Sequence, residues 1–109
     1  MVMIREGRAV SLRASREMYR MLTSSYWRGV AVSQVPPYVQ VASKQGFVDR
    51  SRSEVLLVHS RGGDYVLAVI TRNQADSSPG PDNDGYRLIR AISREVYGHY
   101  NPDHRWLPQ

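Results

Sequence analysis

The sequence contains no cysteine, one phenylalanine and, although fifteen of its residues are basic, only one lysine. The absence of cysteine excludes disulfide bonds and thiolate metal sites, so cysteine usage gives no information on the redox compartment. No apolar run approaches the length of a membrane span, and Arg5 and Glu6 follow the start too closely for a signal peptide. We therefore expect no membrane contact and a cytoplasmic location, or an extracytoplasmic one if the sequence is part of a longer secreted precursor.

Arginine accounts for the remaining basic residues and gives the 109-residue chain a net charge of +5. Such a charge favours nucleic acid or another anionic partner. The arginines are spread along the whole chain instead of forming a cluster, and an arginine-rich, solvated surface is the simpler explanation. Two rows at helical spacing are the candidate phosphate contacts: Arg13, Arg16 and Arg20, and Arg87, Arg90 and Arg94.

Two segments have the apolar periodicity of an amphipathic helix. The first is predicted over residues 12–24, after Ser11, whose hydroxyl can cap a free amide of the first turn. The second is predicted to begin at Asn83 or Asp84 and to end near Gly98, where a C-cap glycine would stand. Their apolar stripes are Ala14, Met18, Met21 and Leu22, and Leu88, Ile89, Ile92 and Val96.

Three segments between these helices are predicted to be strands. Residues 38–43 alternate as a half-buried strand would, and Gly46 is expected to end this strand or to form a bulge in it. Residues 54–59 and 65–71 are apolar runs separated by a short turn that contains two glycines, which indicates an antiparallel hairpin. The Met3–Ile4 segment could form a further short strand.

The expected fold class is α+β: an antiparallel sheet of at least three strands, flanked by an N-terminal and a C-terminal helix. The length fits a single domain over residues 1–109, and the sequence contains no internal repeat and no linker.

This order of elements, together with the Val-Ala-Ser-Lys-Gln-Gly stretch at residues 41–46, resembles the C-terminal part of the class A β-lactamases and penicillin-binding proteins. In that family a strand with Lys-Thr-Gly or Lys-Ser-Gly is followed by a hairpin and a long C-terminal helix. The segment that leads into this strand, Val35, Pro36 and Pro37, is also similar to the family pattern. The same is true of the second hairpin strand at residues 65–71. The resemblance extends from about Val10 to about Tyr100.

The resemblance implies a ligand-binding role for three residues of this strand. Lys44 would be a cation near the carboxylate of a substrate. Gln45 replaces the family's hydroxyl residue, and its amide can still donate a hydrogen bond from a longer arm. Gly46 would allow a ligand to approach the backbone closely. Outside the family, Lys44 would simply be a solvated lysine of a strand.

The family's serine nucleophile is missing from the sequence. Acyl transfer in that family needs Ser-x-x-Lys together with a Ser-x-Asn motif. Lys44 is the only lysine, and no serine stands three residues before it, while Asp82–Asn83–Asp84 lacks the serine of the second motif. We therefore expect no catalytic residue in this chain.

Other candidate sites are weaker. His59, His99 and His104 lack the spacing of a metal site, so we expect no metal and no cofactor. Tyr97, Tyr100 and Trp106 could stack on nucleic-acid bases, but aromatic residues after a helix more often pack against its end.

In the family, additional strands lie beside the second strand of the hairpin. Without them the strand at residues 65–71 would be an apolar free edge, which is a site for strand pairing. The N-terminal segment, a second copy of the chain or a separate chain could cover this edge, and we expect self-association. The leading hypothesis is a truncated, non-catalytic β-lactamase-like protein that self-associates or completes a hydrolase with a partner chain. The alternative is a small basic α+β module that binds nucleic acid or another anionic partner.

Overall fold

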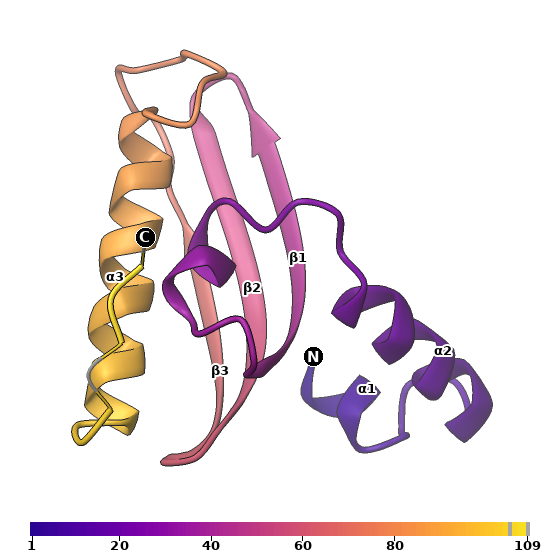
Figure 1. Cartoon of the computed structure of the whole chain (residues 1–109). Helices are drawn as coiled ribbons and strands as arrows, with labels where there is room; N and C mark the ends of the chain where they lie inside the picture. The colour runs from indigo at the N-terminus through magenta and orange to yellow at the C-terminus, as the bar shows by residue number, and fades with distance from the viewer. Residues whose placement is uncertain (105, 109) are drawn as a thin grey trace.

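The computed structural model describes residues 1–104 and 106–108. Two short helices come first, followed by a 3-10 turn, three strands and a long helix (Figure 1). In chain order these elements are α1 (Val2–Arg5), α2 (Leu12–Thr23), η1 (Ala31–Gln34), β1 (Gln40–Val48), β2 (Ser51–Ser60), β3 (Gly63–Ile70) and α3 (Asp84–Tyr100).

The three strands form one antiparallel sheet in the order β1-β2-β3, so β2 lies in the centre and both other strands are edges. Leu56 of β2 pairs with Ser43 on one side and with Leu67 on the other. With helices before and after the sheet, the structure confirms the predicted α+β fold class. A single domain over residues 1–109 stays a prediction.

One face of the sheet is covered by α3 and η1, and the hydrophobic core lies between them (Figure 1). Alternate residues of β2 point to this face, because successive side chains of a strand lie on opposite sides. Burial of these apolar side chains is the main stabilising contribution to the fold. The core consists of Val30, Ala31, Val32, Val35, Val41, Leu56, Val58, Tyr65, Tyr86, Ile89 and Tyr97.

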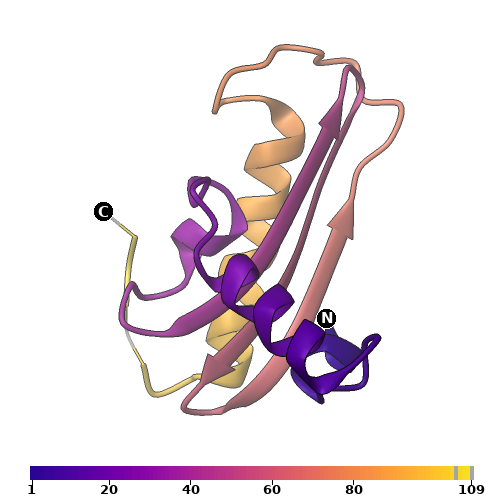
Figure 2. The ribbon, with the colours of Figure 1, turned by 90° about the vertical axis from the view of Figure 1, so that its right-hand side faces the viewer.

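The opposite face is only partly covered. Helix α2 crosses it beside β1 (Figure 2), and Ala42 and Leu57 are buried there. Further along the same face Val66 and Ile70 of β3 are 43% and 76% exposed. The sheet therefore presents an open apolar area next to the free edge of β3.

Both predicted helices are present and begin at the predicted caps. The Ser11 hydroxyl accepts a hydrogen bond from the Ala14 amide, and the Asn83 side chain accepts one from the Gly85 amide. The prediction that Gly98 ends the second helix is wrong, since α3 continues to Tyr100. Asn101 is the actual C-cap.

The contacts of Asn101 explain the longer helix. Its side-chain amide donates to the Tyr97 carbonyl, and its side-chain oxygen accepts the Gly62 amide at 2.9 Å. The end of α3 is thereby attached to the β2–β3 turn, a tertiary contact that local sequence does not reveal.

The Met3–Ile4 segment is helical, so the expectation of a strand there is wrong. The amides of Arg5 and Glu6 donate to the carbonyls of Met1 and Val2, which closes one helical turn. Arg5 also pairs with Asp64 at the start of β3. As a helix, this segment does not supply the extra strand that could cover the edge of β3.

Gly46 neither ends β1 nor forms a bulge in it. The strand continues to Val48, and Gly46 stays in register with Ser53 of β2. The Ser53 hydroxyl donates to the Gly46 carbonyl at 3.0 Å and supports the pairing at this point. An added Cβ at Gly46 would lie 3.0 Å from that hydroxyl oxygen, so the neighbouring strand favours glycine here.

Within the described residues, no helix combines the length and the apolar character needed to cross a membrane.

Candidate functional site

The candidate ligand-binding residues lie together on β1, an edge strand of the sheet. Lys44, Gln45 and Gly46 pair with Val55, Glu54 and Ser53 of β2. Consecutive side chains of a strand point to opposite faces, so Lys44 and Gln45 do not share one face of the sheet.

Lys44 is exposed and points to the partly covered face, the side on which α2 lies. Its ammonium donates a hydrogen bond to the carbonyl of Gln45, and no carboxylate pairs with it among the described residues. An ammonium group in this position is available to an anionic ligand. The role that the family resemblance gives to Lys44 stays a prediction.

Gln45 points to the opposite face, towards the segment before η1. Its side-chain amide donates to the Trp27 carbonyl at 3.5 Å, which is a long, weak hydrogen bond. This placement keeps the amide away from the Lys44 side of the strand.

Glu54, directly across from Gln45, is a buried carboxyl group, although the sequence predicted it only as the first residue of a strand. It is 3% exposed, and its Oε2 accepts the Ala31 amide at 2.6 Å. Its Oε1 has no hydrogen-bond partner among the described residues. Burial raises the pKa of this carboxyl group, and the neighbouring Ala31 amide, Gln45 side chain and Val32 amide only partly oppose that effect.

The position of Glu54 defines its role. It lies on the core face and holds the first residue of η1, which is also fixed by the Ser93 hydroxyl donating to the Ala31 carbonyl at 2.8 Å. Glu54 therefore anchors η1 to β2 behind the candidate ligand strand and does not line the face of Lys44. A polar residue next to an apolar run was the only sequence signal for it.

His59 and His104 form hydrogen bonds with neighbouring side chains. In residues 1–104 and 106–108 there is no group of three or more His, Cys, Asp or Glu side chains that could hold a metal ion. His59 is bonded to Tyr19 and Asp64, and His104 to Tyr38 and Tyr97.

The two arginine rows lie on different helices and are partly engaged within the chain. On α2, Arg20 pairs with Glu17. On α3, Arg87 is near Asp84, while Arg94 donates to the Gln34 side chain. These contacts reduce the number of guanidinium groups available to a phosphate backbone.

Comparison with protein families matches residues 1–100 to the β-lactamase enzyme family. A comparison with curated proteins gave no match. Several solved structures have the same fold. PBP-A is 20% identical with a TM-score of 0.77, and the alignment covers 94% of this chain and 37% of PBP-A.

Two β-lactamases are also similar. The enzyme from Sphaerobacter thermophilus DSM 20745 is 24% identical with a TM-score of 0.77, over 92% of this chain and 37% of that chain. The class A β-lactamase from Mycobacterium abscessus is 16% identical with a TM-score of 0.66, over 83% of this chain and 34% of that one.

The sheet and its flanking helices have a β-lactamase-like fold, and the chain belongs to the β-lactamase enzyme family. It spans 37% of the length of the first solved structures that it matches. The predicted kinship and the predicted partial coverage of the larger fold are both confirmed.

Proposed function

We propose that this chain is a non-catalytic part of a β-lactamase-like serine hydrolase and supplies one wall of its ligand site. The observation that carries the proposal is the exposed position of Lys44 on β1. The chain belongs to the family, but its sequence contains no Ser-x-x-Lys motif. Lys44 would attract the carboxylate of a ligand, as a cation on an exposed strand can. The nucleophile would come from a complementary polypeptide.

One similar solved structure indicates which ligand to test.

 A mutant of PBP-A has been solved as an acyl-enzyme complex with penicillin G, so that mutant is acylated by a β-lactam. Penicillin G carries a carboxylate, and for this reason we choose a penicillin as the probe for the present chain. Acyl transfer needs an activated nucleophile, so the chain by itself should leave the penicillin intact.

We propose that a complementary polypeptide pairs with the free edge of β3 and thereby completes the sheet. An unpaired, apolar edge strand is a template for pairing with another strand. Ile70 is 76% exposed at the end of β3, and the open apolar area of the sheet lies beside it. In the absence of a complementary chain, we propose that two copies pair through this edge.

Analytical ultracentrifugation tests the pairing at micromolar concentration. We expect the native chain to sediment as a dimer, and we expect Ile70→Lys to shift it to the monomer, because a charged side chain on an edge strand opposes pairing. Leu107→Lys is the matched control: Leu107 is also an exposed apolar residue, at 77%, but lies outside the sheet. It should sediment like the native chain. A native monomer, or equal effects of the two substitutions, would contradict edge pairing.

A further inference from the structure

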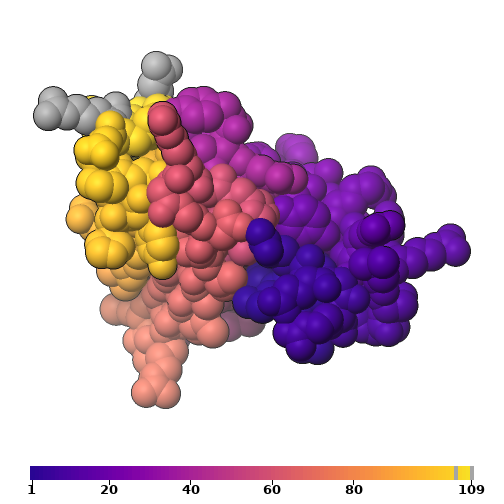
Figure 3. Space-filling model, turned by 90° about the horizontal axis from the view of Figure 1, so that it is seen from below, coloured from indigo at the N-terminus to yellow at the C-terminus, as the bar shows by residue number. Residues whose placement is uncertain are grey.

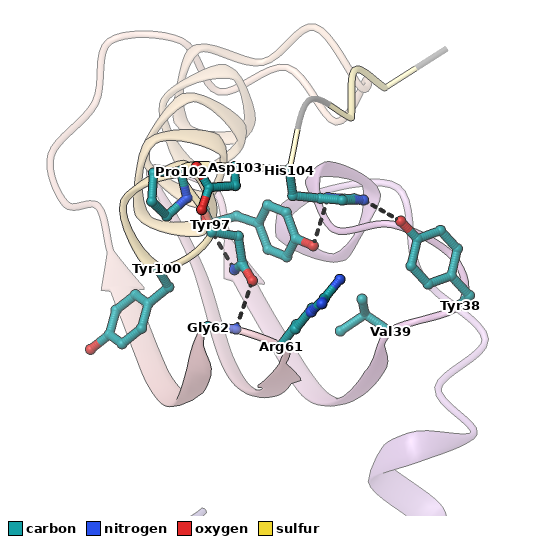
Figure 4. A pocket seen from close by; sticks show the side chains of 10 residues that line it. Tyr38, Val39, Arg61, Gly62, Tyr97, Tyr100, Pro102, Asp103 and His104 are labelled. Carbon is teal, nitrogen blue, oxygen red and sulfur yellow. Dashed lines mark hydrogen bonds between the residues drawn. The ribbon is translucent and has the colours of Figure 1, made fainter.

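A second candidate site lies at the end of the sheet where β1 begins. A cavity of about 530 Å³ opens between the start of β1, the β2–β3 turn and the C-terminal end of α3 (Figure 4). Figure 3 views this end of the molecule from below and shows the turn between the end of α3 on one side and the N-terminal helices on the other. The volume is within the usual range of small-molecule sites.

Aromatic side chains form one wall of this cavity and hold one another in place. The Tyr38 hydroxyl lies 2.5 Å from Nε2 of His104, and the Tyr97 hydroxyl lies 3.2 Å from Nδ1 of the same ring. Both ring nitrogens of His104 therefore take part in hydrogen bonds. Tyr38 lies just before β1, Tyr97 lies on α3, and His104 lies in the segment after α3. Two edge-to-face contacts, each with 6.0 Å between ring centroids, accompany the hydrogen bonds.

Arg61 supplies a cation to the same cavity. Its guanidinium group points from the β2–β3 turn into the space below His104 and Tyr97 (Figure 4). Among the described residues Arg61 forms no ion pair. Asp103 is the one acidic residue of the lining, and it lies at the upper rim, beside Pro102 (Figure 4).

The backbone that carries Arg61 is fixed against α3. The Gly62 amide donates to the Asn101 side chain at 2.9 Å, and the Asn101 amide donates to the Ser60 hydroxyl at 3.0 Å. The turn also lies so close to the helix end that an added Cβ at Gly62 would be 1.6 Å from the Tyr100 carbonyl oxygen. The backbone of the turn, which carries the exposed Arg61 side chain, is thus held against the end of α3.

From this arrangement we infer that the cavity binds a small aromatic carboxylate. The planar guanidinium of Arg61 matches the two oxygens of a carboxylate. The rings of Tyr38, Tyr97 and His104 provide flat, polarisable surface for an aromatic ligand, which prefers stacked or edge-to-face contacts. A neutral ligand would leave the guanidinium without a partner in the cavity.

This site lies at the start of β1, away from Lys44 in the middle of that strand. Val39 lines the cavity, and Lys44 lies five residues further along the strand, a distance of about 16 Å at the rise of an extended chain. The proposed carboxylate site therefore does not depend on the proposed role of Lys44, and either can fail without the other.

Titration of the isotope-labelled chain with benzoate, followed by two-dimensional NMR, tests the inference. We expect saturable shifts of the Gly62 and Asn101 amides. Benzamide, which has the same ring without the charge, should bind about tenfold more weakly, since the charge-assisted pairing with the guanidinium is lost. Acetate, which has the charge without the ring, should also bind more weakly.

Two substitutions in the lining should act in opposite directions. Arg61→Gln should weaken benzoate binding by about tenfold, while Asp103→Asn should strengthen it by about twofold, because a like charge is removed near the carboxylate. Arg87→Gln, an exposed arginine of α3 outside the cavity, is the matched control and should change nothing. Absence of saturable shifts, equal binding of benzamide, or unchanged affinity in Arg61→Gln would overturn the proposal.

Discussion

The hydroxyl of Tyr19 lies 2.7 Å from Nε2 of His59, and this hydrogen bond connects α2 to the sheet. On the other side of the ring, Nδ1 of His59 is 2.9 Å from Asp64, which in turn pairs with Arg5 of α1. A neutral imidazole can donate from Nδ1 and accept at Nε2, so both hydrogen bonds can form at once. The two N-terminal helices are thus attached to the hairpin by one row of polar contacts.

Tyr19→Phe should loosen this attachment. The substitution keeps the ring but removes the hydroxyl partner of His59, and we expect the free energy of unfolding to fall by about 1 kcal/mol. Chemical denaturation measures the loss, and hydrogen exchange should show reduced protection in α2. Tyr26→Phe is the control, because Tyr26 is 97% exposed. An equal loss in both variants would contradict a specific role of the Tyr19–His59 contact.

Arg52 is buried at 1% exposure and holds the loop between β3 and α3 against the sheet. Its guanidinium donates to the carbonyl of Ser51 at 2.9 Å and to the carbonyl of Ser78 at 2.7 Å. It also lies over the ring of Tyr86, 5.2 Å from the ring centroid. One buried side chain therefore connects β2, the loop and α3.

Arg52→Gln should destabilise the chain by at least about 2 kcal/mol, since the shorter amide cannot reach both carbonyls and hydrogen bonds to a charged donor are lost. Chemical denaturation gives this value directly. Arg72→Gln removes an exposed arginine of the same region and should change the free energy of unfolding by less than about 0.5 kcal/mol. If Arg52→Gln were as mild as its control, the loop would not depend on Arg52.

Glu54 should make stability depend on pH. Burial raises the pKa of its carboxyl group in the folded chain above the ordinary value. The folded state therefore favours the protonated form, and the stabilisation is fully present below the ordinary pKa of a glutamate, near 4.3. It is lost as the pH rises through the raised pKa of the folded state.

The difference between the native chain and Glu54→Gln isolates this effect from carboxyl groups with lowered pKa, such as Asp64 and Asp76. Relative to the variant, the native chain should lose free energy of unfolding as the pH rises from 4 to 8, as measured by denaturation at each pH. A difference that is constant over this range would show that Glu54 titrates as an ordinary carboxyl group.

The sequence predicted the elements whose signals are local. The caps at Ser11 and Asn83 and the apolar periods predicted α2 and α3, while the alternation over residues 38–43 and the glycines of the hairpin turn predicted the three strands. It did not predict η1, because that turn depends on Glu54 and Ser93, which are distant in the sequence. Contacts of this kind appear only when the chain is folded.

The two candidate sites also differ in whether a local sequence signal could reveal them. The Lys-x-Gly strand is a continuous motif, so residues 44–46 could be located from the sequence. The cavity beside Arg61 combines Tyr38, Arg61, Tyr97 and His104, whose proximity results from the packing of α3 against the end of the sheet. The sequence indicated Tyr97 only as a candidate for base stacking or for packing at the helix end.

The proposal that the chain does no acyl transfer by itself is tested most directly by intact-protein mass spectrometry after incubation with penicillin G. The PBP-A mutant that has been solved as a penicillin G acyl-enzyme is the positive control. Circular dichroism on the same sample establishes that the chain is folded. We predict an unchanged mass for this chain. A stable mass increase equal to one penicillin G molecule on the folded chain would contradict the account.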